Sequence, residues 1–87
     1  MKEITVKLLN EDGLHGRAAA NFVKEASKFQ SDVKLVLDEV TVNGKSIIGI
    51  MSLGVFGGEE ITLKTEGEDE EEAINTLEKL VTNKFED

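Results

Sequence analysis

The chain of 87 residues contains no cysteine, no proline, no tryptophan and no tyrosine, and it has a single histidine. Without cysteine it can form neither a disulfide framework nor a thiolate metal site. One histidine is also too few for the usual structural zinc site. We therefore expect no bound metal and no cofactor.

Long apolar runs and positive charge are scarce as well. No apolar run approaches the roughly 20 residues that span a bilayer. Nothing at the start resembles a signal peptide, because Met1–Glu3 leads directly into an alternating segment. The 10 basic and 18 acidic residues leave a formal charge of −8, which argues against direct binding of nucleic acid. We expect a cytoplasmic protein without membrane insertion.

The apolar residues recur with two periods along the chain. Alternation is typical of half-buried strands, and spacings of three and four are typical of amphipathic helices. Strands that are apolar on alternate positions need a helical layer on one face. We therefore predict one α+β domain over residues 1–87, an open-faced sandwich in which a four-stranded, mainly antiparallel sheet carries three helices on one face. In the predicted order β-α-β-β-α-β-α, the strands are 2–9, 33–37, 40–42 and 61–65, and the helices are 16–29, 46–53 and 69–84.

Capping residues predict where two of the helices begin. Ser46 is a good N-cap for the short helix and Asp69 for the last one, where Glu70–Glu72 place negative charge in the first turn. In the first helix we expect Phe22 and Phe29 to lie in the core.

The segment Gly13-Leu14-His15-Gly16-Arg17 puts the only histidine at the predicted mouth of the first helix. The N–H groups of a first turn are unpaired and the helix dipole adds partial positive charge, so an anion is favoured there. Histidine also titrates nearest neutrality and offers a neutral nucleophilic nitrogen. The alternative is a histidine that only caps the helix or fills a partly buried position.

Two segments stand out as motifs. The first is Gly-Leu-His-x-Arg at residues 13–17, and the second is Asn-Gly-Lys-Ser-Ile-Ile-Gly-Ile-Met-Ser-Leu-Gly at residues 43–54. Both resemble the histidine-containing phosphocarrier (HPr) family of the phosphoenolpyruvate-dependent sugar phosphotransferase system. Glu-Gly-Glu-Asp-Glu at residues 66–70 adds weaker support. Length, element order and motif spacing agree, so the resemblance covers essentially the whole chain.

The resemblance implies a phosphocarrier that is not itself an enzyme. His15 would accept a phosphoryl group on Nδ1 from phospho-enzyme I and pass it to the enzyme IIA units of sugar permeases. Arg17 matches the arginine that stabilises the transferring group, and the amides of Gly16 and Arg17 can point at the phosphoryl oxygens. An independent enzyme is disfavoured, because the chain has neither a nucleotide-binding loop nor a second base beside the imidazole.

The resemblance also implies a regulatory site at Ser46. In HPr-like proteins of low-GC Gram-positive bacteria, HPr kinase/phosphorylase modifies the matching serine, and the product is a corepressor for catabolite control protein A. The alternative is a simple N-cap, worth about 1 kcal/mol. If the two sites lie about 10 Å apart, phosphates on both would repel by about 2–3 kcal/mol before screening. Such repulsion would oppose transfer at His15, and obstruction of enzyme I docking would have the same result.

Partner docking is expected on the outer face of the short helix. Exposed apolar side chains beside two phosphate-accepting helix ends would form a compact contact patch, while Ile50 and Leu53 face the core. The alternative is that all of these apolar residues are core. We expect a monomer. The side chains predicted to contact partners are Ile47, Ile48 and Met51, with flanking positive contacts from Lys24 and Lys45.

Three residues depart from the family pattern. Most members have proline at the position of Ala18, alanine or threonine at Gly16, and serine, threonine or asparagine at Asp12. Ala18 lacks the φ restraint of proline and Gly16 adds backbone freedom, while the carboxylate of Asp12 would repel an incoming phosphoryl group. These departures predict a looser loop and slower transfer. They leave open a mainly regulatory paralogue that acts through phosphorylated Ser46 and repressor binding, with weak transfer at His15.

Overall fold

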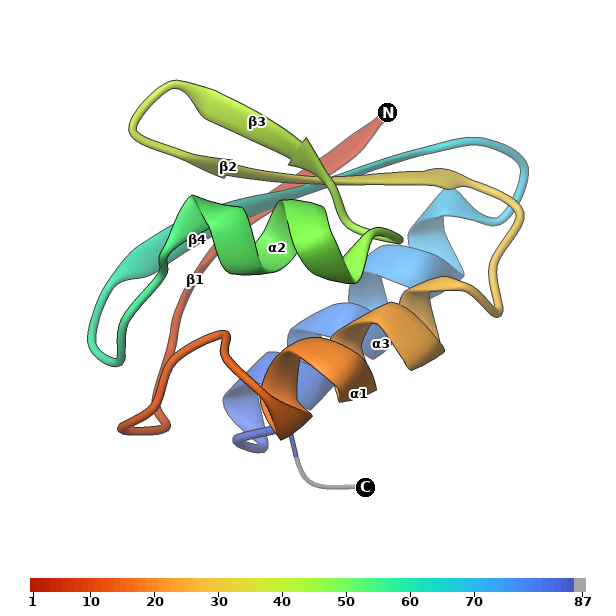
Figure 1. Ribbon diagram of the computed structural model, residues 1–87. Helices are drawn as coiled ribbons and strands as arrows, with labels where there is room; N and C mark the ends of the chain where they lie inside the picture. The colour runs from red at the N-terminus through yellow and green to blue at the C-terminus, as the bar shows by residue number, and fades with distance from the viewer. Residues whose placement is uncertain (86–87) are drawn as a thin grey trace.

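The computed structural model describes residues 1–85, and in that part of the chain a four-stranded sheet carries three helices on one face (Figure 1). The predicted fold class is confirmed. No helix between residues 1 and 85 is long and apolar enough to cross a membrane. In chain order the elements are β1 (Lys2–Lys7), α1 (Arg17–Ala26), β2 (Asp32–Leu37), β3 (Val40–Asn43), α2 (Ile47–Leu53), β4 (Glu60–Glu66) and α3 (Glu70–Thr82).

The sheet has the strand order β1-β4-β2-β3, and every neighbouring pair is antiparallel. Its register aligns apolar residues from all four strands. Ile4 lies opposite Leu63, Leu63 opposite Leu35, and Leu35 opposite Val42. Because side chains alternate between the two faces of a strand, this register places one apolar row on the helical side.

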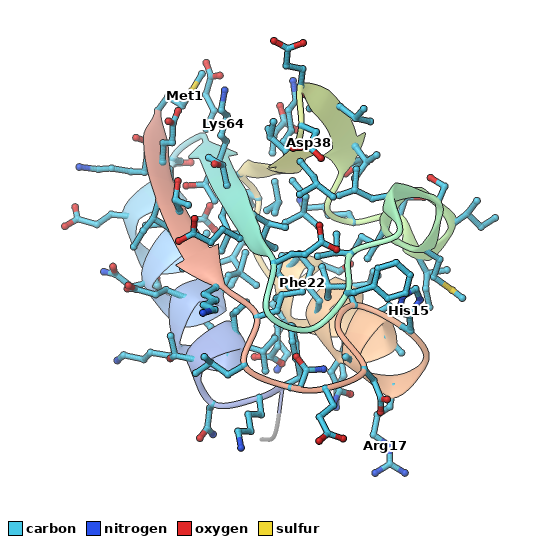
Figure 2. All side chains as sticks on the ribbon, turned by 90° about the vertical axis from the view of Figure 1, so that its left-hand side faces the viewer. Met1, His15, Arg17, Phe22, Asp38 and Lys64 are labelled. Carbon is cyan, nitrogen blue, oxygen red and sulfur yellow. The ribbon has the colours of Figure 1, made fainter. Side chains whose placement is uncertain are left out.

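The core lies between the sheet and the helices. Phe22 of α1 is fully buried and lies in the interior of the molecule, as predicted (Figure 2). Ile50 of α2 and Leu77 of α3 are equally buried. Each helix therefore contributes large apolar side chains to one continuous core.

The first helix is shorter than predicted. It ends at Ala26 instead of residue 29, because the amides of residues 28 and 29 bond three residues back and close a turn. The amide of Lys28 donates to Glu25 at 3.1 Å and that of Phe29 donates to Ala26 at 3.2 Å. The turn leaves Phe29 only half-buried, so its assignment to the core was wrong.

Asp69 occupies the N-cap position of α3 but does not cap it. Its side chain makes no hydrogen bond to the helix. The carboxylate instead accepts from the amides of Gln30 and Ser31, both at 2.9 Å, and from the Ser31 hydroxyl. The hydroxyl first and the Gln30 amide next lower the pKa of Asp69 from 3.8 to about 2. The predicted cap is therefore a clasp between the α1–β2 turn and the start of α3.

The last helix also ends earlier than predicted, at Thr82 instead of residue 84. Lys84 and Phe85 have φ angles of 56° and 63°. These left-handed conformations cannot continue a right-handed helix.

Candidate functional site

The segment before α1 is held against the loop between α2 and β4. The amide of Leu14 donates to Val55 at 3.1 Å, and that of Gly58 donates to Leu8 at 2.9 Å. A Cβ at Gly13, where φ is 64°, would lie 2.3 Å from the Val55 oxygen, so only glycine fits there. These contacts fix the direction in which the chain enters α1.

Gly16 is the N-cap of α1 and has φ 53° and ψ −121°. Residues with a Cβ rarely adopt this conformation, and glycine adopts it without steric cost. No side chain caps the helix, and its first turn carries no acidic residue. Within residues 1–85, the amides of Gly16 and Arg17 donate no hydrogen bond. The N-terminus of α1 is therefore an open end with unpaired donors, as predicted.

His15 lies directly before this open end and is half-buried. Its imidazole packs against the ring of Phe56, with centroids 5.4 Å apart and the ring planes at 46°. The Nε2 atom is buried without a hydrogen-bond partner in the described chain, whereas Nδ1 is neither buried in this way nor hydrogen-bonded. The ring thus presents Nδ1 to the outside. An open depression of about 500 Å³ is lined here by Glu11, Asp12, His15, Gly16, Arg17 and Phe56.

Arg17 is exposed, and its guanidinium group points away from His15 into solvent (Figure 2). Over residues 1–85 it forms no ion pair and no hydrogen bond. The structure brings the two residues to one site without direct contact between the imidazole and the guanidinium group. An unpaired guanidinium on a flexible stem is available to bind a phosphoryl group.

Ser46 is the N-cap of α2, as predicted. Its backbone is extended, with φ −116° and ψ 115°, and its Oγ accepts from the amide of Gly49 at 3.1 Å. Gly54, with φ 68°, ends the helix in the left-handed conformation that glycine favours. The short helix is thus defined by local signals at both ends.

The outer face of α2 is apolar and exposed, whereas Ile50 is fully buried and the half-buried Leu53 packs against the core. This agrees with the predicted division of the helix. Of the two flanking lysines, Lys24 is exposed, whereas the ammonium of Lys45 donates to the Phe29 carbonyl at 2.8 Å. The exposed fractions are 40% for Ile47, 78% for Ile48 and 47% for Met51.

Phe56 is the site residue that sequence reasoning missed. It lies in the glycine-rich loop after α2, where no apolar periodicity marks a buried or a functional position. Its contact with His15 depends on the packing of two loops that are distant in the chain.

A family model described as the phosphotransferase-system HPr component phosphorylation site matches residues 2–83. This chain belongs to the HPr family. It is 46% identical to the phosphocarrier protein HPr of Treponema pallidum over 83 residues, which cover 95% of this chain and 94% of that protein. The family assignment makes it a phosphocarrier protein of the phosphotransferase system.

Solved structures of HPr and of an HPr-like protein share the fold. A crystal structure of HPr-C-His from Thermoanaerobacter tengcongensis superposes with a TM-score of 0.96 at 53% identity, over 98% of this chain and 96% of that chain. The catabolite repression protein Crh of Bacillus subtilis, crystallised as a swapped, intertwined dimer, gives a TM-score of 0.79 at 45% identity, with both chains fully covered.

Proposed function

We propose that His15 accepts a phosphoryl group on Nδ1 from phospho-enzyme I and passes it to the enzyme IIA units of sugar permeases. The observation that supports this is the imidazole at the open N-terminus of α1, with Nδ1 accessible and Nε2 buried. The dipole of such a helix end stabilises an anion by roughly 0.3–1 kcal/mol. That is enough to favour the bound phosphoryl group while leaving its transfer reversible.

The chain's own residues suffice for this step. The lone pair of Nδ1 attacks phosphorus, the P–N bond forms as the bond to the donor breaks, and Nε2 keeps its proton. The amides of Gly16 and Arg17 donate to the phosphoryl oxygens, and the Arg17 side chain compensates their charge. Phosphoryl transfer needs little from a protein beyond positioning and charge compensation.

Incubation with phosphoenolpyruvate and enzyme I tests the carrier function. We expect an acid-labile phosphoprotein that loses its label to an enzyme IIA unit. The His15→Gln variant, shown by circular dichroism to be folded, should take up no label. A folded wild-type chain that takes up no acid-labile label would contradict the proposal.

We further propose that HPr kinase/phosphorylase modifies Ser46, and that the product binds catabolite control protein A. Ser46 precedes the exposed apolar face of α2, so a phosphate there lies beside the proposed docking residues Ile47, Ile48 and Met51, flanked by Lys24 and Lys45. At an N-cap a phosphate retains acceptor oxygens for the helix amides, and the dipole favours its charge. Mass spectrometry after incubation with the kinase should show one phosphate on wild type and none on Ser46→Ala.

The likeness to Crh, whose name refers to catabolite repression, favours a second candidate, a mainly regulatory protein with weak transfer at His15. The enzyme I assay separates the two functions. Modification of Ser46 without acid-labile labelling of His15 would support the regulator.

We propose that the chain acts as a monomer in the cytoplasm and forms one domain over residues 1–87. Sedimentation equilibrium at increasing concentration tests the first point. A mass of two chains at micromolar concentration would contradict it and would match the dimeric state of Crh.

A further inference from the structure

Phe56 is a large aromatic side chain that is 62% exposed, although its chain neighbour Val55 and Leu14 of the loop before α1 are fully buried. Its backbone is held in place from both directions. The Phe56 amide donates to the Glu59 carboxylate at 2.9 Å, and the Glu59 amide donates to the Phe56 carbonyl at 3.2 Å. The Phe56 Cα also lies 2.7 Å from the position of a Cβ at Gly13. The turn therefore fixes the backbone from which the ring projects.

The exposed ring packs on the imidazole of His15. The centroid separation of 5.4 Å and the tilt of 46° fall within the range of favourable aromatic pairs. The same imidazole has one nitrogen buried without a partner and the other accessible. For phosphoryl transfer, the nitrogen and the phosphorus must approach to about 3–3.5 Å in line, which a buried nitrogen cannot do.

We propose that Phe56 is a positioning residue that closes Nε2 to phosphoryl donors and to water, and so restricts the phosphoryl group to Nδ1. This inference rests on the proposed function, because it concerns the phosphoryl group that His15 accepts. An imidazole open on all sides offers a nucleophilic nitrogen at either position. The Phe56 ring shields Nε2 from solvent, and a phosphoryl group on Nδ1 lies at the open N-terminus of α1.

A small donor tests Phe56 without any docking protein. With phosphoramidate, the lone pair of Nδ1 attacks phosphorus, the P–N bond of the donor breaks, and its nitrogen leaves as ammonia while Nε2 keeps its proton. Phosphorus and nitrogen NMR distinguish the Nδ1 from the Nε2 phosphohistidine, and the loss of either signal with time gives its hydrolysis rate.

Wild type should form the Nδ1 isomer. The Phe56→Ala variant should raise the share of the Nε2 isomer by about tenfold, the factor expected when a buried, unpaired polar edge becomes hydrated. The Phe56→Tyr variant keeps the ring and should behave as wild type. Val40→Ala is the matched control, since Val40 is 53% exposed and follows the Asp38 turn, which lies far from His15 (Figure 2).

Two outcomes would overturn the inference. The first is an unchanged isomer ratio and hydrolysis rate in Phe56→Ala, with thermal unfolding confirming that the variant is folded. The second is a defect of this variant with enzyme I alone, since Phe56 would then be a docking residue. Failure of enzyme I to label wild type would contradict the carrier function, whereas the expected isomer shift with phosphoramidate would still support the role of Phe56.

Discussion

The N-termini of α1 and α3 lie at opposite ends of the helical layer (Figure 1). They differ in the negative charge that the chain places beside them. The first turn of α3 carries the acidic residues 70–72, and Glu70 also accepts from the Gly67 amide at 3.1 Å and pairs with the Met1 ammonium at 3.0 Å. The Gly67 amide first and the Met1 ammonium next lower the pKa of Glu70. The first turn of α1 has no acidic residue and no side-chain cap.

The attraction between a helix N-terminus and negative charge therefore contributes to stability at α3, whereas at α1 it is available for binding an anion. A helix end whose charge is permanently compensated contributes to stability. A helix end left uncompensated keeps its donors available for an anion that comes and goes. The phosphoryl group at His15 would give the N-terminus of α1 a temporary negative charge, whereas residues 70–72 give the N-terminus of α3 a permanent one. Substitutions at four positions test this contrast.

Removal of the cation beside the open helix end should have the largest effect on transfer. We expect Arg17→Ala to slow phosphorylation by enzyme I by about 10²–10³-fold, the loss typical for one donor to a charged transition state. Because Arg17 is exposed and unpaired over residues 1–85, the free energy of unfolding should change by less than about 0.5 kcal/mol. Rapid-quench labelling and urea unfolding measure the two quantities. Large destabilisation with normal transfer would make Arg17 a structural residue.

Removal of the clasp at the other end should have the reverse effect. We expect Asp69→Asn to lower Tm by several degrees and to leave the transfer rate unchanged. The neutral side chain of asparagine replaces the charged carboxylate that accepts hydrogen bonds from the backbone amides of Gln30 and Ser31. The control is Glu68→Gln, at an exposed neighbouring position.

The pH dependence of stability also tests the contribution of the Asp69 carboxylate. The pKa of Asp69 is lowered from 3.8 to about 2 in the folded state, so folding favours the ionised form. Its stabilisation is therefore complete above about pH 5 and is lost as the pH falls from about 4 through 2. The difference in Tm between wild type and Asp69→Asn should shrink over that interval. A constant difference down to pH 2 would contradict this account.

The N-terminus of α2 lies between these two extremes, since it has a neutral cap. We expect Ser46→Ala to reduce the free energy of unfolding by about 1 kcal/mol, because the Gly49 amide loses its acceptor. Ser46→Asp should restore the cap and lower the transfer rate, as the phosphate is proposed to do. Equal transfer by all three proteins would remove the support for regulation at this position.

A permanent charge at α1 should make that helix resemble α3. Ala20 is exposed in the first turn of α1, so we expect Ala20→Glu to raise the free energy of unfolding by about 0.3–1 kcal/mol. The same charge should repel the phosphoryl group and slow its acceptance by about two- to fivefold. The control is Ala20→Gln, which should change neither quantity by as much.

The sequence predicted most of the fold and most of the site because their signals are local. Alternation along β4 and the spacing of Phe22 in α1 identify a strand and a helix without knowledge of their neighbours. Ser46 could be identified as a cap from its position alone. The prediction for Phe29 failed because helix spacing continues past Ala26, where the chain instead turns toward β2.

Asp69 shows the limit of local reasoning most clearly. Its position before three acidic residues predicted a cap, but its carboxylate binds groups 38 and 39 positions earlier in the chain. Once the α1–β2 turn lies beside the start of α3, two amides and a hydroxyl of that turn donate hydrogen bonds to the Asp69 carboxylate. Such a competition between partners is decided only when the helices and the sheet have packed.

The sequence by itself determined the order of the elements, the apolar faces and the placement of His15 before the first helix, because each follows from neighbours within a few residues. The tertiary structure alone decided that Phe56 lies on the imidazole, that Nε2 is buried and that Asp69 joins the α1–β2 turn to the start of α3. These contacts link segments distant in the chain, and packing against the common core brings such segments within reach of one another.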